Sequence, residues 1–269
     1  MTMLRLGVVA ICAIATAGMT AQTKKAPAKQ AAPAPAPAPK REMPVPFKAG
    51  EVLEFDVGWS SYVTAGTATV TVKEKKPSYS SVAYYVVAEG RPTALLSKLY
   101  TLYYKADTLI DVYNLLPQRG SLYVEEGKRH RMKTTTFDQP AKKATFQVET
   151  RTTVKTDLVI PGFTQDALSA IYALRSIPFK AGEKITMPVT DNGHVYKVLM
   201  QAGAVEPVKT GMGTINGLKI TPVISGPDKD APRGLALWIS DDARKLPLKM
   251  EAQLLVGTFV ITLRQANGM

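Results

Sequence analysis

The stretch PFKAGEVLEFDVGW, residues 46–59, indicates the fold class. Within it Leu53, Phe55, Val57 and Trp59 alternate with polar or small residues. A period of two is typical of a β-strand with one buried face and one wet face. The same alternation recurs at 68–72, 82–88, 122–124 and 146–148. We therefore expect a mainly β protein with on the order of twelve to fourteen strands.

The first six residues of this stretch occur twice. PFKAGE stands at 46–51 and again at 178–183, each time before a predicted strand. The favoured interpretation is one turn used twice, in which Phe packs inward, Gly adopts a backbone angle that other residues avoid, and Glu opens the strand. The alternative is a sheet of two parts, each starting at this turn. The flanking sequences differ, which favours the first interpretation.

Two segments interrupt the strand pattern and predict short helices. Residues 94–102 form the first candidate. The second covers 166–177, with Thr164 expected as its N-cap and Pro178 as the residue that ends it. Residues spaced i, i+3, i+4 and i+7 share one face of this helix: Leu168, Ile171, Tyr172 and Arg175. A tight hairpin turn is expected at Asp191-Asn192-Gly193, because Asn-Gly tolerates positive φ.

The N-terminus has the features of an export signal over residues 1–21. Arg5 is followed by the apolar run 6–15 and by small residues suited to cleavage near Ala17 or Ala21. The run is shorter than the roughly 20 residues that span a bilayer, so an uncleaved anchor is the second choice. Cleavage would also remove Cys12, the single cysteine. The expected location is the periplasm of a Gram-negative cell.

Residues 22–46 predict a disordered linker ahead of one domain at 47–269. An Ala-Pro repeat at 32–39 and scattered lysines leave no apolar face to bury, so the segment should stay extended. The alternative is a basic arm that touches anionic lipid, cell-wall polymer or a partner protein.

The composition argues against most catalytic chemistries. The chain of 269 residues carries 34 Lys+Arg and 22 Asp+Glu, a net charge of +12, but one Cys and two His. Zinc ribbons and disulfide scaffolds are excluded by these counts, and no nucleophile elbow, metal-binding helix motif or P-loop is present. His130 and His194 are interpreted as surface residues. We expect no catalytic residue, no metal, no cofactor and no nucleic-acid partner.

Two charged clusters remain open to functional interpretation. Asp241 and Asp242 are expected to shape a tight turn with Arg244 paired locally, the alternatives being a calcium site or an acid/base pair. In the basic run 128–133, one strand face carries Arg129, Arg131 and Lys133. We interpret this face as solvated, the alternative being a grip on phosphates of lipid or glycan.

Three strings resemble a known family. FKAGEVLEF at 47–55 resembles its opening, DALSAIYALR at 166–175 its central helix, and LWISDDARKLP at 237–247 its near-terminal strand pair. The family is that of bacterial exported proteins grouped as domain of unknown function 3108, and the resemblance covers about 47–265. It implies a long antiparallel sheet curled into a spiral or open β-barrel, with a helix beside or inside it. That shape is similar to periplasmic lipoprotein carriers, and the resemblance implies no enzyme activity.

The leading hypothesis is a non-enzymatic periplasmic envelope protein. Its curved sheet would offer a concave apolar face, partly plugged by helix 166–177, to a lipid, an acyl chain or a protein segment, with peripheral membrane contact allowed. The residues expected to line this concavity are Leu168, Ile171, Tyr172 and Trp238, for which plain core packing is the competing explanation. The alternatives are an adaptor that binds an envelope partner through a sheet edge or the basic arm, and a hydrolase of cell-wall or glycan material that uses Asp241 and Asp242.

Overall fold

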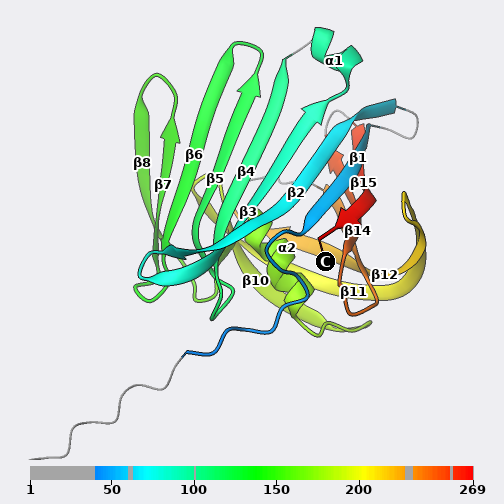
Figure 1. Ribbon diagram of the computed structural model, residues 1–269. Coiled ribbons are helices and arrows are strands. Elements are labelled where there is room, and N and C mark those ends of the chain that lie inside the picture. Colours follow the sequence, from blue (N-terminus) through cyan, green and yellow to red (C-terminus); the bar gives the residue numbers. More distant parts are fainter. Residues whose placement is uncertain (1–39, 60–62, 100, 228–232, 255–256, 269) are drawn as a thin grey trace, which may run out of the picture. The chain divides into compact units, whose positions relative to one another are not determined.

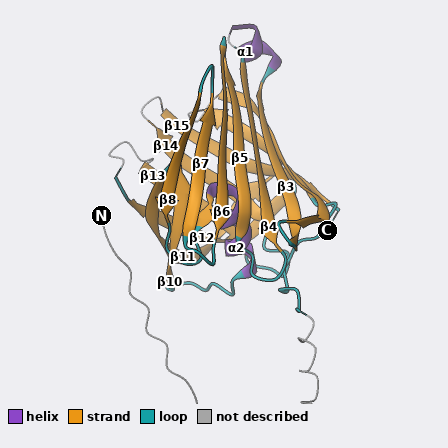
Figure 2. Ribbon diagram, turned by 90° about the vertical axis from the view of Figure 1, so that its left-hand side faces the viewer, coloured by secondary structure: helices purple, strands orange, loops and turns teal. Residues whose placement is uncertain are grey.

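A single curled sheet dominates the fold (Figures 1 and 2). The computed structural model describes residues 40–268 except 60–62, 100, 228–232 and 255–256. The described residues form one fifteen-stranded sheet and two helices, which confirms the mainly β prediction with slightly more strands than expected. The predicted export signal lies outside the described residues.

The sheet consists of two meanders that meet at strands β1 and β15. The first meander contains β1 (Val52–Trp59), β2 (Val63–Ser78), β3 (Ser81–Pro92), β4 (Leu102–Asp111), β5 (Pro117–Glu126), β6 (Arg129–Asp138), β7 (Lys143–Glu149) and β8 (Thr153–Val159). The second contains β9 (Gln165–Asp166), β10 (Lys184–Asp191), β11 (His194–Thr210), β12 (Gly213–Ser225), β13 (Arg233–Ser240), β14 (Pro247–Leu254) and β15 (Gly257–Asn267).

The two ends of the sheet do not pair with each other. The spatial order runs β8 to β1 and then β15 back to β9, so β8 and β9 are its edges. The neighbours are antiparallel except β9 and β10, which are parallel. The sheet is therefore open, as the open-barrel prediction allowed. Side chains bridge part of the gap, since Val195 of β11 packs against a cluster that contains Phe137 and Ala144.

Each copy of PFKAGE forms the same turn and leads into a strand. In both copies the phenylalanine is buried, the glycine has positive φ, and the glutamate N–H donates to the carbonyl oxygen of the lysine three residues earlier. These features belong to Phe47, Gly50 (φ +95°) and Glu51 in the first copy, and to Phe179, Gly182 (φ +84°) and Glu183 in the second. The first copy leads into β1 and the second into β10. The turn was thus interpreted correctly. The sheet also has two parts, but the second part starts at β9, before its copy of the turn.

Helix α2 (Ala167–Ser176) lies between the two meanders. Its N-cap is Asp166, whose Oδ1 accepts from the backbone N–H of Leu168 and of Ser169, both at 2.9 Å. Ser169 Oγ accepts in return from the Asp166 N–H at 2.9 Å and completes a capping box. The predicted cap at Thr164 is wrong, because its hydroxyl donates to the Pro161 carbonyl oxygen instead.

The helix is buried on two faces. Tyr172 and Leu168 pack with the cluster of the first meander, whereas Ala170, Ala173 and Leu174 pack with that of the second. The sequence pattern predicted only the first of these faces. The C-terminal end is as expected, since Ile177 before Pro178 is extended at φ −90° and ψ 135°.

The other local predictions are largely confirmed. Helix α1 (Ala94–Leu99) occupies part of the first candidate segment. The β10–β11 hairpin turns through Asn192 and Gly193 at φ 48° and 76°.

The compact unit begins at Lys40, before the predicted start at Phe47. Within the segment assigned to the linker, Met43 N–H donates to the Val112 carbonyl oxygen at 2.9 Å.

A buried ion pair fastens α2 to the rest of the fold. Arg175 Nη1 and Nη2 donate to Glu51 Oε1 and Oε2 at 2.6 and 2.7 Å, and the two side chains are 0% and 1% exposed. Arg175 Nε donates to the Lys245 carbonyl oxygen at 2.9 Å, which adds the β13–β14 turn to the same junction. This bidentate arrangement satisfies most of the guanidinium donors, as a buried charge requires.

Removal of one partner should therefore be costly. We expect Glu51→Leu to lower the free energy of unfolding by about 3–5 kcal/mol, because it leaves a buried guanidinium without its counterion. The double variant Glu51→Leu/Arg175→Met should recover part of this loss. Urea unfolding followed by circular dichroism measures both values.

The second turn supplies the control. Glu183 occupies the same place in its turn, but it is exposed and accepts a hydrogen bond from the Lys180 N–H at 2.8 Å. Glu183→Leu should cost no more than about 1.5 kcal/mol. Equal losses for Glu51→Leu and Glu183→Leu would contradict the role assigned to the ion pair.

Candidate functional site

A sizeable cavity opens at the α1 end of the concave sheet face. It has a volume of about 510 Å³ and is called here the rim cavity. Its walls come from β1, β2, β3, β4, β15 and α1, and they include Val57, Trp59, Gly90, Leu96, Tyr104 and Phe259. Trp59 and Phe259 are ladder partners whose rings stack with centroids 6.5 Å apart. The lining is almost entirely apolar.

A second apolar space lies between α2 and the sheet. This helix cavity of about 180 Å³ is lined by Leu168, Ile171 and Tyr172 on one side and by strand residues such as Phe55 on the other. It shares Ala68 and Ile261 with the rim cavity. An apolar lining therefore runs along the concave face from α1 to α2.

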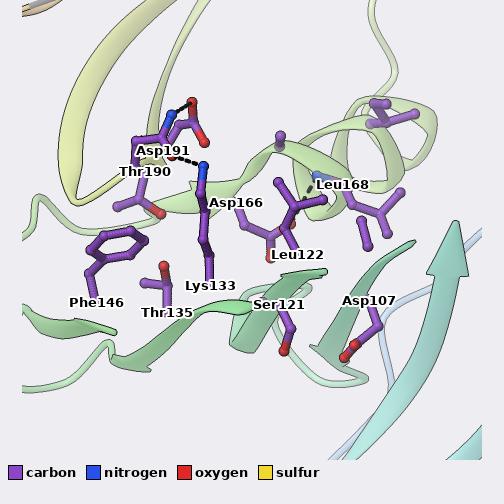
Figure 3. Close-up of a pocket in the computed structure, with 15 residues that line it drawn as sticks. Asp107, Ser121, Leu122, Lys133, Thr135, Phe146, Asp166, Leu168, Thr190 and Asp191 are labelled. Atoms are coloured by element: carbon purple, nitrogen blue, oxygen red, sulfur yellow. Dashed lines mark hydrogen bonds between the residues drawn. The ribbon is translucent and has the colours of Figure 1, made fainter. Parts of the chain in front are cut away.

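A third, more polar space of about 290 Å³ lies at the N-terminal end of α2 (Figure 3). Lys133 Nζ donates to Asn192 Oδ1 at 2.5 Å across it, which links β6 to the β10–β11 turn. Leu168 and Ile171 line both this polar cavity and the helix cavity. Asp107 and Ser121 border it, but Figure 3 shows their side chains directed away from its centre.

Asp166 is the acidic group most enclosed by the polar cavity. Burial raises its pKa, while hydrogen bonds from the Thr108 hydroxyl, Ser169 and the Leu168 N–H act in the opposite direction. Thr108 Oγ1 donates to Asp166 Oδ2 at 2.6 Å. Since these donors occupy the carboxylate, its evident role is to hold the helix N-terminus against β4.

Three of the four residues predicted to line the concavity are brought together there. Leu168, Ile171 and Tyr172 line the helix cavity, but Trp238 is not among the described lining residues. Trp238 is buried in the hydrophobic cluster that contains Leu246 and Leu248, and its Nε1 donates to Glu206 Oε1 at 2.6 Å. Its neighbour Leu237 lines the helix cavity instead, because successive residues of a strand point to opposite faces.

The basic residues of β6 do not form one exposed surface. They share a strand face as expected, but this face runs from the α1 end of β6 into the concavity. Arg129 is exposed, Arg131 pairs with Glu126 at 2.5 Å, and Lys133 lines the polar cavity. The predicted basic surface at Arg129, Arg131 and Lys133 is thus corrected to a graded series, because strand alternation fixes the face but not its exposure.

The acidic pair occupies a tight turn. Asp242 Oδ1 accepts from Ser240 Oγ and from the Arg244 N–H, at 2.8 and 3.0 Å, and Oδ2 pairs with the Arg244 guanidinium. Asp241 lies 3.7 Å from Lys245 Nζ. Asp241 borders a hollow of about 370 Å³ that Asp242 does not line, so the two carboxylates do not face one space as an acid/base pair would.

The turn has a consequence for acid stability. Partial burial would raise the pKa of Asp242, but hydrogen bonds from Arg244 and Ser240 outweigh it and lower this pKa below its usual value. A lowered folded-state pKa contributes stability above the unfolded value of about 3.9, and the contribution disappears as the pH falls through the folded-state pKa. Asp242→Asn should therefore be less stable than the unmodified chain at pH 7, with a difference that shrinks below about pH 4.

Thermal unfolding at pH 7, 5 and 3 measures this difference. Asp157→Asn is a suitable control, since that exposed carboxylate on the edge strand accepts a single hydrogen bond from Thr145 at 2.9 Å. A difference for Asp242→Asn that is independent of pH would contradict the assignment.

The histidines and the remaining acids offer no metal centre within the described ranges. His130 and His194 are both exposed strand residues, as interpreted from the sequence. No group of three or more His, Cys, Asp or Glu side chains in the described residues is placed to hold a metal ion.

The sequence interpretation missed most of the rim cavity. Trp59, Phe259 and Leu96 come from three distant segments, so no spacing links them. One signal was available at Gly90, because a glycine inside a strand often marks a place where space is needed beside the backbone. An added Cβ at Gly90 would lie 3.9 Å from the Tyr104 Cβ, which is ordinary contact.

The fold and its cavities define a class: an open, curled antiparallel β protein with an apolar groove along its concave face. Residues 54–264 match the family model "Protein of unknown function (DUF3108)". The chain belongs to the DUF3108 family, which confirms the resemblance. The search of curated proteins found no match. No helix in the described part of the chain has the length and apolar character needed to cross a membrane.

One solved structure supports the fold assignment. A beta-barrel-like protein of domain of unknown function DUF1849 from Brucella abortus aligns with a TM-score of 0.51 and 10% identity, over 81% of this chain and 97% of that one. A candidate exported protein with a YmcC-like fold from Bacteroides fragilis aligns at 0.37 and 9%, over 85% and 100%. A candidate lipoprotein from Parabacteroides distasonis aligns at 0.36 and 8%, over 84% and 100%. At 10% identity the first likeness shows a shared fold alone.

Proposed function

We propose that this protein is an exported, non-enzymatic envelope protein that binds an acyl chain along the concave face of its sheet. One observation carries the proposal: the rim cavity and the helix cavity share Ala68 and Ile261, so their apolar linings are continuous. The rim cavity, at about 510 Å³, lies within the range of about 300–1,000 Å³ usual for small-molecule sites.

The chemistry of the lining suits a hydrocarbon chain. Burial of each methylene group is worth about 0.8 kcal/mol, so a chain several carbons long gains substantial free energy from such walls. At the inner end, α2 presents Leu168 and Ile171, and next to them lies the polar cavity with Lys133. An amphiphile could therefore bury its tail while a polar group reaches a cation.

The periplasm is the proposed location. The support comes from residues 1–21, whose charged start, apolar run and small residues have the pattern of an export signal.

The absence of enzymatic activity is part of the same proposal. Asp166 caps a helix and Asp242 organises a turn, so these carboxylates already have structural roles.

Filling the rim cavity should weaken acyl-chain binding. Gly90→Phe places a ring in the cavity without backbone strain, since an added Cβ meets nothing closer than the Tyr104 Cβ at 3.9 Å. Displacing two methylene groups costs about 1.6 kcal/mol, so the affinity for cis-parinaric acid should fall about tenfold or more. Fluorescence titration of the purified protein measures it.

Gly203→Phe provides a matched control. Gly203 is an exposed strand residue outside the described cavity linings, and an added Cβ there meets the Lys219 carbonyl oxygen at 3.5 Å. This variant should bind the probe as the unmodified chain does. Failure of the unmodified chain to bind cis-parinaric acid, together with no lipid in native mass spectra, would overturn the proposal.

A second candidate function is an adaptor that binds a partner strand at β8. This strand is a free edge of the sheet, and Val154 and Val159 on it are 60% and 84% exposed. Free edges can accept an extended segment through main-chain hydrogen bonds.

A photoreactive residue in place of Lys155 should then crosslink one partner in cells. The same photoreactive residue in place of the exposed Lys73, on the central strand β2, should not. No crosslink at Lys155 would count against the adaptor.

A further inference from the structure

The end of the sheet that carries α1 combines exposed apolar side chains with cations. We call this surface the α1 rim and define it by Trp59, Leu95, Lys98, Tyr104, Lys128 and Arg129. Figures 1 and 2 show α1 projecting beyond the strands at this end, away from α2. The rim cavity opens at the same place, since Trp59 and Tyr104 also line it.

Backbone hydrogen bonds join the segments of the α1 rim. Thr93 N–H, just before α1, donates to the Ala65 carbonyl oxygen of β2 at 2.9 Å. Gly127 N–H in the β5–β6 turn donates to the Thr101 carbonyl oxygen, just after α1, at 2.8 Å. The helix is thereby held beside the start of β2 and the β5–β6 turn, so the rim is one surface.

The apolar part of the rim faces solvent. Leu95 on α1 is 72% exposed, Trp59 is 40% exposed and Tyr104 is 37% exposed. Trp59 stacks on Phe259, which places an aromatic pair at the mouth of the cavity. Tryptophan and tyrosine are enriched at membrane–water interfaces, where an apolar ring and a polar tip are both accommodated.

The charge at the rim is positive. The acidic side chain on its concave side is already paired, since Glu126 lies 2.5 Å from Arg131. Glu89 lies on the other face of β3, because its neighbours Ala88 and Gly90 line the concave cavities, and it pairs with Arg91 and Lys105 at 3.8 and 3.6 Å. Glu125 lies on the other face of β5 by strand alternation. Lys98, Lys128 and Arg129 are exposed and form no ion pair within the described part of the chain.

We propose that the α1 rim docks onto an anionic lipid bilayer, and that an acyl chain passes from the bilayer into the rim cavity. Cations near an anionic membrane surface contribute about 1 kcal/mol each, and apolar side chains that enter the interface add to this. A bilayer fits better than a protein partner because the exposed apolar residues surround the mouth of a cavity suited to hydrocarbon. This inference rests on the proposed acyl-chain binding.

Vesicle flotation tests the docking. The chain without residues 1–21 should float with vesicles of equal parts phosphatidylglycerol and phosphatidylcholine. It should float much less with vesicles of pure phosphatidylcholine. Added salt should weaken binding because it screens the cations. The chain has two tryptophans, and Trp238 is buried, so a blue shift of the emission on binding reports Trp59. The shift should be absent in Trp59→Phe.

Charge reversal at the β5–β6 turn should weaken vesicle binding, whereas charge reversal at the β6–β7 turn should not. Lys128→Glu/Arg129→Glu alters the β5–β6 turn at the rim, and should weaken vesicle binding roughly thirty-fold or more. Lys142→Glu/Lys143→Glu makes the same charge change at the opposite end of β6, where both lysines are exposed. Segment 22–46 is present in both, so the difference between them reports the rim.

A second pair of variants tests the apolar contact. Leu95→Glu should weaken vesicle binding, whereas Val159→Glu should not, because Val159 is 84% exposed but pairs with Lys143 at the far end of β7. Both positions are exposed, so neither change should unfold the protein. Docking is overturned if the unmodified chain ignores anionic vesicles, or if the far-end variants lose binding as much as the rim variants.

Soluble probe binding separates this failure from failure of the acyl-chain site. Lys128→Glu/Arg129→Glu should still bind cis-parinaric acid, and Gly90→Phe should still float with anionic vesicles. Probe binding without vesicle binding would overturn docking alone. Vesicle binding without probe binding would overturn the acyl-chain site and, with it, the transfer of a chain into the cavity.

Discussion

The pairing of Arg175 with Glu51 holds the two halves of this fold together. Glu51 ends the turn that opens the first meander, and the carbonyl oxygens of Arg244 and Lys245 belong to a turn of the second. Burial of two charges is expensive, and it is tolerated here because the carboxylate and the two carbonyl groups occupy the guanidinium donors. Helix α2 is thereby fixed as the inner wall of the concave face.

The position of α2 explains why the groove is deep at one end and open at the other. The helix covers the concave face near the polar cavity, and its Leu168 and Ile171 form the wall of the helix cavity. Towards α1 no second helix of the described residues lies inside the curled sheet, and the facing strands carry small residues at Gly66, Ala68 and Gly90. Small side chains on a curved sheet leave room that large ones would fill, so an apolar groove remains.

Much of the local structure follows from neighbouring residues in the chain. Alternation identified β1, Asn192 and Gly193 identified a hairpin turn, and spacing identified one face of α2. The errors occurred where local rules allow two answers. Thr164 and Asp166 are both able to cap a helix, and Trp238 and Leu237 are both apolar strand residues. A bulge between Trp238 and Ile239 adds to the ambiguity, because a one-residue shift moves a side chain to the other face.

The amino-acid sequence by itself determined the strand-rich class, the repeated turn, the helix and the family, because each depends on residues close together in the chain. The tertiary structure alone decided that Glu51 meets Arg175, 124 residues away, and that Trp59 pairs with Phe259. It also decided that the sheet stays open and that its concave face keeps an apolar groove. The physical reason is that burial and strand pairing are properties of distant segments brought together, and no local pattern specifies which segments meet.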